Sequence, residues 1–110
     1  MKAGMKIAVT LPDGSTQEVV AKPMSSVMSA MRDAGVLVRA ECGGAMACAT
    51  CHVHVDPAWI EKTGAARGEE ADLLDMSDYR AELSRLSCQI RMTPALHGLA
   101  VTLQLDAFEG

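Results

Sequence analysis

Hydrophobic and polar residues alternate near the start of the chain, in the segment MKIAVTL at residues 5–11. A period of two residues is typical of a half-buried strand. The letters PDG at 12–14 predict a turn, and residues 16–21 predict the returning strand of an N-terminal hairpin. The side chains expected on the buried face of the first strand are Met5, Ile7, Val9 and Leu11.

The hydrophobic period then changes to that of a helix. We predict a helix over residues 25–34, with Ser25 at its N-cap and Gly35 at its end. Its apolar residues at helical spacing are Val27, Met28 and Met31. We interpret both methionines as core residues, because the flexible thioether side chain fills irregular gaps in a core.

Shorter patterns follow in the second half of the chain. HVHV at 52–55 alternates like a strand, and residues 68–76 predict a second helix. Residues 87–92 and 100–105 predict two further strands, and the inward positions of the last strand are Val101, Leu103 and Leu105. This order of elements predicts an α+β fold with one small mixed sheet.

Composition narrows the class of protein. With 110 residues, of which 49% are hydrophobic and 22% charged, the chain is typical of a globular protein, and we take residues 1–110 as a single domain. No apolar run reaches the roughly 18 residues needed to span a bilayer, and the N-terminus lacks the pattern of a secretory signal, so we expect a cytoplasmic protein. The formal net charge of -4 disfavours nucleic acid and anionic membranes as partners.

Four cysteines with the spacing C-x5-C-x2-C-x36-C give the strongest chemical signal. In a reducing cytoplasm they favour metal binding or redox chemistry over structural disulfides. Three thiolates from one loop of small, uncharged residues and a fourth from a distant segment supply the soft ligands that a 2Fe-2S cluster requires. These candidate ligands are Cys42, Cys48, Cys51 and Cys88.

Other metal and haem sites explain the cysteines less completely. Covalent haem attachment through the segment CATCH would leave Cys42 and Cys88 without a role. A Rieske centre needs two histidine ligands, and only Cys51 and His54 have the expected spacing. A redox dithiol at Cys48 and Cys51 would again leave two cysteines unused. Structural zinc stays open, although Cys88 lacks the close partner that zinc sites usually have.

The segments CGGAMACATCHV and RLSCQIRMTP resemble the adrenodoxin and putidaredoxin group of 2Fe-2S ferredoxins, and look most like its bacterial members. Plant-type ferredoxins have the spacing C-x4-C-x2-C instead. The resemblance implies a β-grasp fold with one main helix and a cluster-binding loop. It also implies that all four cysteines are cluster ligands.

The same resemblance implies a one-electron carrier that has no substrate chemistry of its own. A flavin-dependent NAD(P)H ferredoxin reductase would supply the electrons, and a cytochrome P-450 monooxygenase would receive them. A Rieske-type oxygenase or the iron-sulfur assembly machinery is an alternative acceptor. We expect a monomer from the cytoplasm of a bacterium.

An acidic segment, EEADLLDMSD, occupies residues 69–78. Taken alone, its acids fit a solvated helix face near a helix N-terminus, where the helix dipole favours negative charge. The resemblance instead assigns this helix to docking on basic surfaces of the partners. Carried over by position, the docking acids are Asp72 and Asp75, supported by Glu69 and Glu70.

Two residues beside the cysteines complete the predicted site. Glu41 precedes the first cysteine, where similar proteins carry an acid that contacts the partner. His52 follows Cys51. By the same resemblance, its ring hydrogen-bonds across to the acidic helix region. We interpret His52 as a structural coupler between the cluster and the docking surface, and a histidine with a purely structural role is the alternative.

Overall fold

The alternating residues at the N-terminus form the predicted hairpin in the computed structural model, which describes residues 4–39 and 51–108. β1 (Met5–Thr10) and β2 (Thr16–Ala21) pair in antiparallel fashion. Met5, Ile7 and Val9 are buried as predicted. The hairpin forms one edge of the sheet, because β2 lies outermost.

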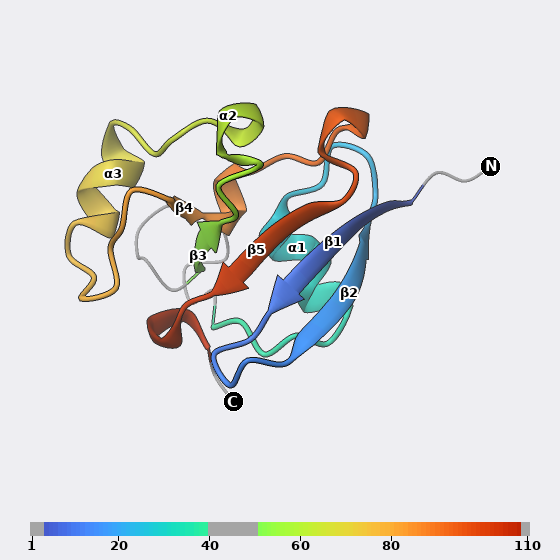
Figure 1. Cartoon of the computed structure of the whole chain (residues 1–110), viewed down its shortest axis with the longest axis horizontal. Coiled ribbons are helices and arrows are strands. Elements are labelled where there is room, and N and C mark those ends of the chain that lie inside the picture. The colour runs from blue at the N-terminus through green and yellow to red at the C-terminus, as the bar shows by residue number, and fades with distance from the viewer. Residues whose placement is uncertain (1–3, 40–50, 109–110) are drawn as a thin grey trace.

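Three more strands complete a mixed sheet with the order β2-β1-β5-β3-β4 (Figure 1). They are β3 (His52–Val55), β4 (Ser84–Leu86) and β5 (Leu99–Leu103). β5 runs parallel to β1 and antiparallel to β3, and β3 pairs antiparallel with β4. The predicted α+β class with a small mixed sheet is confirmed, and its strands come from both ends of the described chain.

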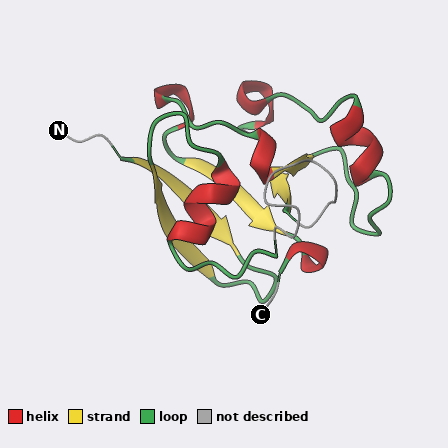
Figure 2. Ribbon diagram, turned by 180° about the vertical axis from the view of Figure 1, so that it is seen from behind, coloured by secondary structure: helices red, strands yellow, loops and turns green. Residues whose placement is uncertain are grey.

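Helix α1 (Val27–Asp33) lies across the back of the sheet (Figure 2). Its N-cap is Ser26, one residue later than predicted: the Ser26 hydroxyl accepts a hydrogen bond of 3.0 Å from the Ser29 amide. The Ser25 hydroxyl donates instead to the Lys22 carbonyl at 2.7 Å. Ser25 therefore belongs to the preceding turn, and the prediction that it caps the helix was wrong.

The core between the sheet and α1 is aliphatic, as the low aromatic content indicates. From α1 it receives Val27, Met28, Ala30 and Met31, which confirms the core role of the two methionines. The sheet supplies the inward residues of every strand. The largest apolar side chains that are fully buried are Ile7, Met31, Leu74, Leu86, Met92, Leu99 and Leu103.

Two short helices lie between β3 and β4. The sequence did not predict α2 (Ile60–Thr63), and α3 (Glu69–Leu74) is shorter than the predicted helix over 68–76. Because α3 ends at Leu74, Met76 lies beyond it and is 82% exposed rather than packed on the core. None of the helices in the described ranges combines the length and the apolar character needed to cross a membrane.

The region around Cys88 is not the strand that was predicted over residues 87–92. β4 ends at Leu86, and Ser87–Gln89 form one turn of 3-10 helix that carries Cys88. The chain then meets the start of α1, where Ser26 and Arg91 form an isolated β-bridge. The hydrophobic period gave a wrong prediction here because the apolar residues belong to a 3-10 turn and a β-bridge rather than to one continuous strand.

The last predicted strand also ends early. β5 stops at Leu103, and the chain turns into a second 3-10 helix (Leu105–Ala107). Leu105 is therefore 55% exposed instead of facing the core, and Ala107 is buried.

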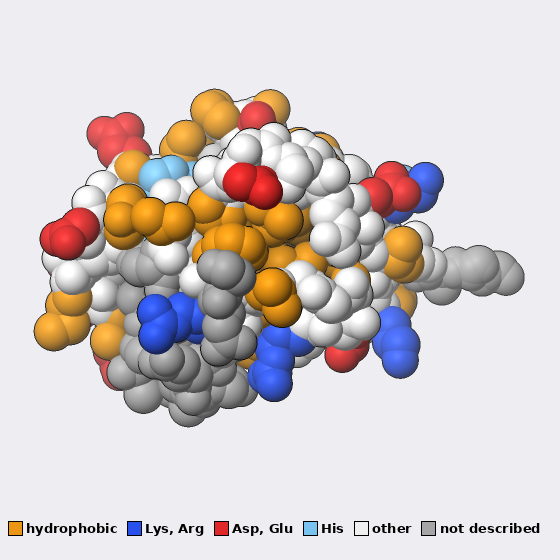
Figure 3. Space-filling view, turned by 90° about the horizontal axis from the view of Figure 1, so that it is seen from below, with side chains coloured by type: hydrophobic (Ala, Val, Ile, Leu, Met, Phe, Trp, Pro, Cys, Tyr) orange, Lys and Arg blue, Asp and Glu red, His pale blue; other side chains and the backbone are white. Residues whose placement is uncertain are grey.

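Leu105 and Tyr79 line an open groove of about 380 Å³ beside the β1–β2 turn. Figure 3 shows hydrophobic side chains gathered at the centre of this face. Another short 3-10 helix, Pro94–Leu96, lies earlier in the chain, between Cys88 and β5.

Candidate metal centre

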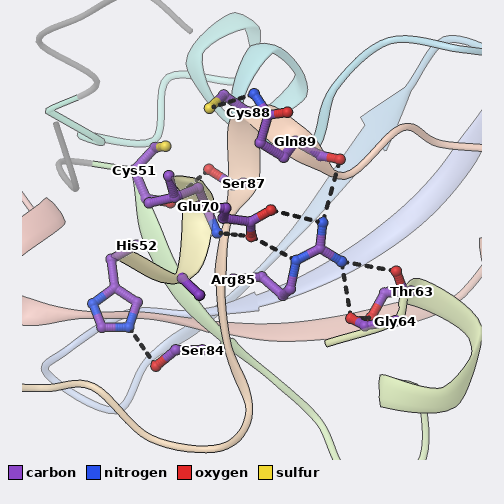
Figure 4. Close-up of polar contacts among 12 residues, drawn as sticks. Cys51, His52, Thr63, Gly64, Glu70, Ser84, Arg85, Ser87, Cys88 and Gln89 are labelled. Atoms are coloured by element: carbon purple, nitrogen blue, oxygen red, sulfur yellow. Dashed lines mark hydrogen bonds and ion pairs between the residues drawn. The ribbon is translucent and has the colours of Figure 1, made fainter. Parts of the chain in front are cut away.

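Cys51 and Cys88 lie side by side because of the pairing of β3 with β4. Cys51 comes directly before β3, and His52 pairs with Leu86 at the end of β4. The Ser87 amide and hydroxyl both donate to the Cys51 carbonyl, at 3.0 and 2.8 Å. These bonds continue the pairing past the last regular strand residues. Figure 4 shows the two sulfur atoms pointing toward one another.

The two thiol groups share a hydrogen bond in a buried environment. Cys51 is 1% exposed and Cys88 is 5% exposed. The bond from Cys51 lowers the pKa of Cys88 to about 6, against the opposing effect of burial. The same bond, together with burial, raises the pKa of Cys51. The two buried sulfurs face each other (Figure 4) and are placed to bind a single cationic centre of the kind that takes thiolate ligands.

The other two predicted ligands, Cys42 and Cys48, lie outside the described residues, as does Glu41. Within the described ranges, no group of three or more His, Cys, Asp or Glu side chains is arranged to hold a metal ion. The described part of the chain thus supplies two of the four predicted ligands. Their contact, burial and charge fit a thiolate-bound cluster.

His52 lies behind the cysteines and is fully buried. Its Nε2 shares a hydrogen bond of 2.7 Å with the Ser84 hydroxyl, and its Nδ1 shares one of 3.3 Å with the Ser77 hydroxyl. Ser77 follows α3, so these contacts join the residue after Cys51 to the acidic helix region. They are the physical basis for the coupling role of His52, which stays a prediction. The two serine partners were not foreseen.

Glu70 has a different environment from the one predicted. Its side chain is 9% exposed and forms a two-pronged ion pair with Arg85: Nε to Oε2 is 2.6 Å and Nη2 to Oε1 is 3.2 Å. Glu70 Oε2 also accepts a hydrogen bond of 2.9 Å from the Leu86 amide. A carboxylate held in this way is directed into the protein rather than toward solvent, and its supporting role in docking stays a prediction that the burial disfavours.

Arg85, which the sequence analysis did not identify, connects the segments around Cys88 (Figure 4). Its Nη1 donates to the carbonyls of Thr63 and Gly64 at 2.7 and 2.9 Å. Its Nη2 also reaches the carbonyl of Gln89 at 3.5 Å. One guanidinium therefore joins the end of α2, α3 and the turn that carries Cys88. The only sequence signal was an arginine in a short strand just before the last cysteine.

The remaining acids of α3 are not equivalent. Glu69 and Asp72 are exposed. Asp75 pairs with Arg80, whose Nη1 lies 2.8 Å from Asp75 Oδ1 and also donates to the Ala71 carbonyl at 2.9 Å. Arg80 thus neutralises part of the charge of Asp75 and satisfies a carbonyl in the last turn of the helix. Within α3 itself, the exposed acids without such an ion pair in the described residues are Glu69 and Asp72, and Asp78 is a further exposed acid of the same segment.

A small mixed sheet with two buried cysteines facing each other is typical of a protein whose thiolates bind a metal centre. The model of the 2Fe-2S iron-sulfur cluster binding domain matches residues 10 to 93, so the chain belongs to this family. A 2Fe-2S ferredoxin of Castellaniella defragrans is 41% identical over 88% of this chain and 94% of its own length.

Solved structures agree with the sequence match. The crystal structure of a ferredoxin from Rhodopseudomonas palustris HaA2 has a TM-score of 0.88 and 40% identity, and the alignment covers 93% of this chain and 98% of that one. Putidaredoxin in the covalent putidaredoxin reductase-putidaredoxin complex has a TM-score of 0.83 and 37% identity, covering 89% and 96%. The protein is a 2Fe-2S ferredoxin of the putidaredoxin and adrenodoxin type, an electron carrier whose cofactor is a 2Fe-2S cluster. The expected resemblance, fold and cofactor are confirmed.

Proposed function

We propose that this protein carries single electrons from a flavin-dependent NAD(P)H reductase to a cytochrome P-450 monooxygenase and has no catalytic activity of its own. The observation that carries the proposal is the exposed acidic surface of α3, joined by hydrogen bonds through His52 to the residue after Cys51. The reductase step has further support, because the similar putidaredoxin forms a complex with putidaredoxin reductase. The protein acts as a monomer of one domain in the cytoplasm of a bacterium.

The four cysteines Cys42, Cys48, Cys51 and Cys88 hold the cluster in this proposal. When bound, the cluster takes up and releases one electron. The chain contributes the thiolates, a buried aliphatic surround at Cys51 and Cys88, and the hydrogen bonds that fix both residues. A reducing cytoplasm keeps the thiols available for assembly.

The acidic surface steers the protein to basic partners. Two ferric ions, two sulfides and four thiolates add about -2 to the charge of the chain, whose formal value is -4. A negative carrier is attracted at long range to a positive partner, which raises the association rate more than the affinity. Salt screens this attraction, so the carrier also leaves readily. The docking acids are Asp72 and Glu69, with Glu41 and the partly neutralised Asp75 in lesser roles.

The identity of the acceptor is tested by capture from a bacterial lysate. The holoprotein is immobilised, the lysate is applied at low salt, and the bound fraction is eluted with salt. We expect the reduced eluate to show the carbon monoxide difference band of a haem-thiolate protein. We also expect a captured flavoprotein that supports NAD(P)H-dependent reduction of that haem only when fresh holoprotein is added.

A column that carries the Glu69→Gln/Asp72→Asn variant serves as the matched control and should retain less of both proteins. An eluate that contains iron-sulfur proteins without the haem-thiolate band would move the acceptor to a Rieske-type oxygenase or to the cluster assembly machinery. It would overturn the monooxygenase assignment while leaving the electron carrier in place.

A further inference from the structure

The side chain of Gln89 makes a direct contact with one of the proposed cluster ligands. Its Nε2 donates a hydrogen bond of 3.5 Å to the sulfur of Cys88 (Figure 4). Gln89 is exposed, whereas the neighbouring Cys88 is 5% exposed. The amide therefore reaches from the protein surface to a buried sulfur atom, within one turn of 3-10 helix.

The main chain on both sides of this contact is anchored. The Gln89 carbonyl accepts a hydrogen bond of 3.5 Å from Arg85, and the Ile90 amide donates to the Ser87 carbonyl at 3.3 Å. The Ile90 carbonyl in turn accepts a hydrogen bond of 2.9 Å from Val27 at the start of α1. These bonds fix the backbone from which the Gln89 side chain extends, so the side chain starts from a defined position beside the sulfur.

A donor at this position stabilises negative charge on the sulfur. The Gln89 Nε2–H group is directed at the Cys88 sulfur, so negative charge on that atom is stabilised by the positive end of the N–H dipole. Reduction of an iron-sulfur cluster adds one negative charge, part of which resides on the ligand sulfurs. A donor to such a sulfur therefore stabilises the reduced state more than the oxidised state.

We propose that Gln89 tunes the redox potential of this ferredoxin, by donating a side-chain hydrogen bond to the Cys88 sulfur that favours the reduced cluster. Gln89 is a positioning and tuning residue rather than a ligand. The inference rests on the proposed ligand role of Cys88, but it does not depend on which reductase or acceptor the protein serves.

The test is the midpoint potential of the isolated holoprotein, measured by spectroelectrochemistry without any partner. Gln89→Leu removes the donor at similar size, and we expect the equilibrium constant for reduction to fall threefold to tenfold, which lowers the potential by about 30 to 60 mV at 59 mV per tenfold for one electron. Gln89→Glu removes the donor and adds negative charge, so its potential should be lower still. Gln17→Leu is the matched control, because the Gln17 amide donates to the Ala34 carbonyl and not to sulfur.

An unchanged potential in Gln89→Leu, with a lowered one only in Gln89→Glu, would overturn the hydrogen-bond proposal and leave a charge effect. If Gln89→Leu assembles no cluster, Gln89→Ala provides the same comparison. Cys88→Ser separates the two possible failures. A visible spectrum that is unaltered in Cys88→Ser would remove Cys88 from the ligands, whereas an altered spectrum combined with an unshifted Gln89→Leu potential would reject the tuning role alone.

Discussion

At the scale of single residues, the pair of Glu70 and Arg85 is the most consequential feature outside the cysteines. Both side chains are 9% exposed, and the pair also satisfies one amide and three carbonyls of the surrounding backbone. The removal of one member of a buried pair leaves an uncompensated charge in a medium that solvates it poorly. A single substitution in the pair should therefore lower the stability of the fold strongly. The intact pair itself adds little to the free energy of unfolding compared with apolar packing.

Glu70→Ala is expected to destabilise the protein by about 3 to 5 kcal/mol, because Arg85 would keep its charge without a partner. Thermal unfolding of the holoprotein, followed by far-UV circular dichroism and cluster absorbance, should show a melting temperature lowered by about 10 °C or more. The matched control is Glu69→Ala, one residue earlier and exposed, which should change stability by less than about 0.5 kcal/mol. Equal melting temperatures for the two variants would contradict the structural role of Glu70.

At the scale of elements, α1 shows how a tertiary contact selects one of two neighbouring caps. Ser25 and Ser26 are chemically identical candidates. The Met92 amide donates to the Ser25 carbonyl at 2.8 Å, and Ser26 forms a bridge with Arg91. These contacts with the segment after Cys88 set the point at which the chain leaves its extended conformation. They place the Ser26 hydroxyl, and not that of Ser25, over the first turn of the helix.

Ser26→Ala should therefore cost about 1 kcal/mol through the loss of the cap. The amide of Ser29 would lose its acceptor in a position where Ser26 is 6% exposed. Ser25→Ala is the control and should cost less, since the Ser25 hydroxyl donates to the Lys22 carbonyl in the preceding turn and does not cap the helix. Chemical denaturation of the two variants side by side provides the measurement. A larger loss in Ser25→Ala would mean that α1 begins one residue earlier than observed.

At the scale of the whole molecule, the charges relevant to docking are unevenly distributed over the sheet. α3, with exposed Glu69 and Asp72, packs against β4 at one edge. β2 forms the opposite edge, where the exposed Glu18 pairs loosely with Lys6 at 3.8 Å. Under the proposed function, we expect a basic partner to be attracted most strongly to the α3 edge, where the hydrogen bonds to His52 begin. If α3 is the docking element, the position of a charge, and not only the net charge, should affect the rate of reaction with the partner.

Asp72→Asn should lower the rate of reduction by the reductase at low ionic strength several-fold and leave the visible spectrum unchanged. The difference from the unmodified protein should shrink as salt is added, because exposed charges are screened over about 10 Å at 0.1 M salt. Glu18→Gln changes the net charge equally at the far edge of the sheet and should have a smaller effect. Stopped-flow reduction across a salt series checks this. Equal slowing by both substitutions would show that only net charge matters and that α3 is not the docking element.

Local patterns were sufficient to predict the elements whose residues face one consistent environment. The hairpin, α1 and β3 follow from periods of two and 3.6, because each side chain position repeats its exposure along the element. Local patterns did not predict the structure at residues 87–92 and 100–105, because the apolar residues there continue past the point where the backbone changes direction. Leu105 and Met76 are apolar yet exposed for the same reason, since each lies just beyond the end of its element.

The sequence by itself determined the family, the cofactor and the sheet-forming segments, because ligand spacing and hydrophobic period are properties of the chain alone. Only the tertiary structure decided which acids face solvent and which groups surround the cysteines. Glu69 and Glu70 are adjacent, but neighbouring helical residues point about 100° apart, and the position of Arg85 turns one of them inward. Such contacts join residues far apart in the chain, and no local pattern encodes them.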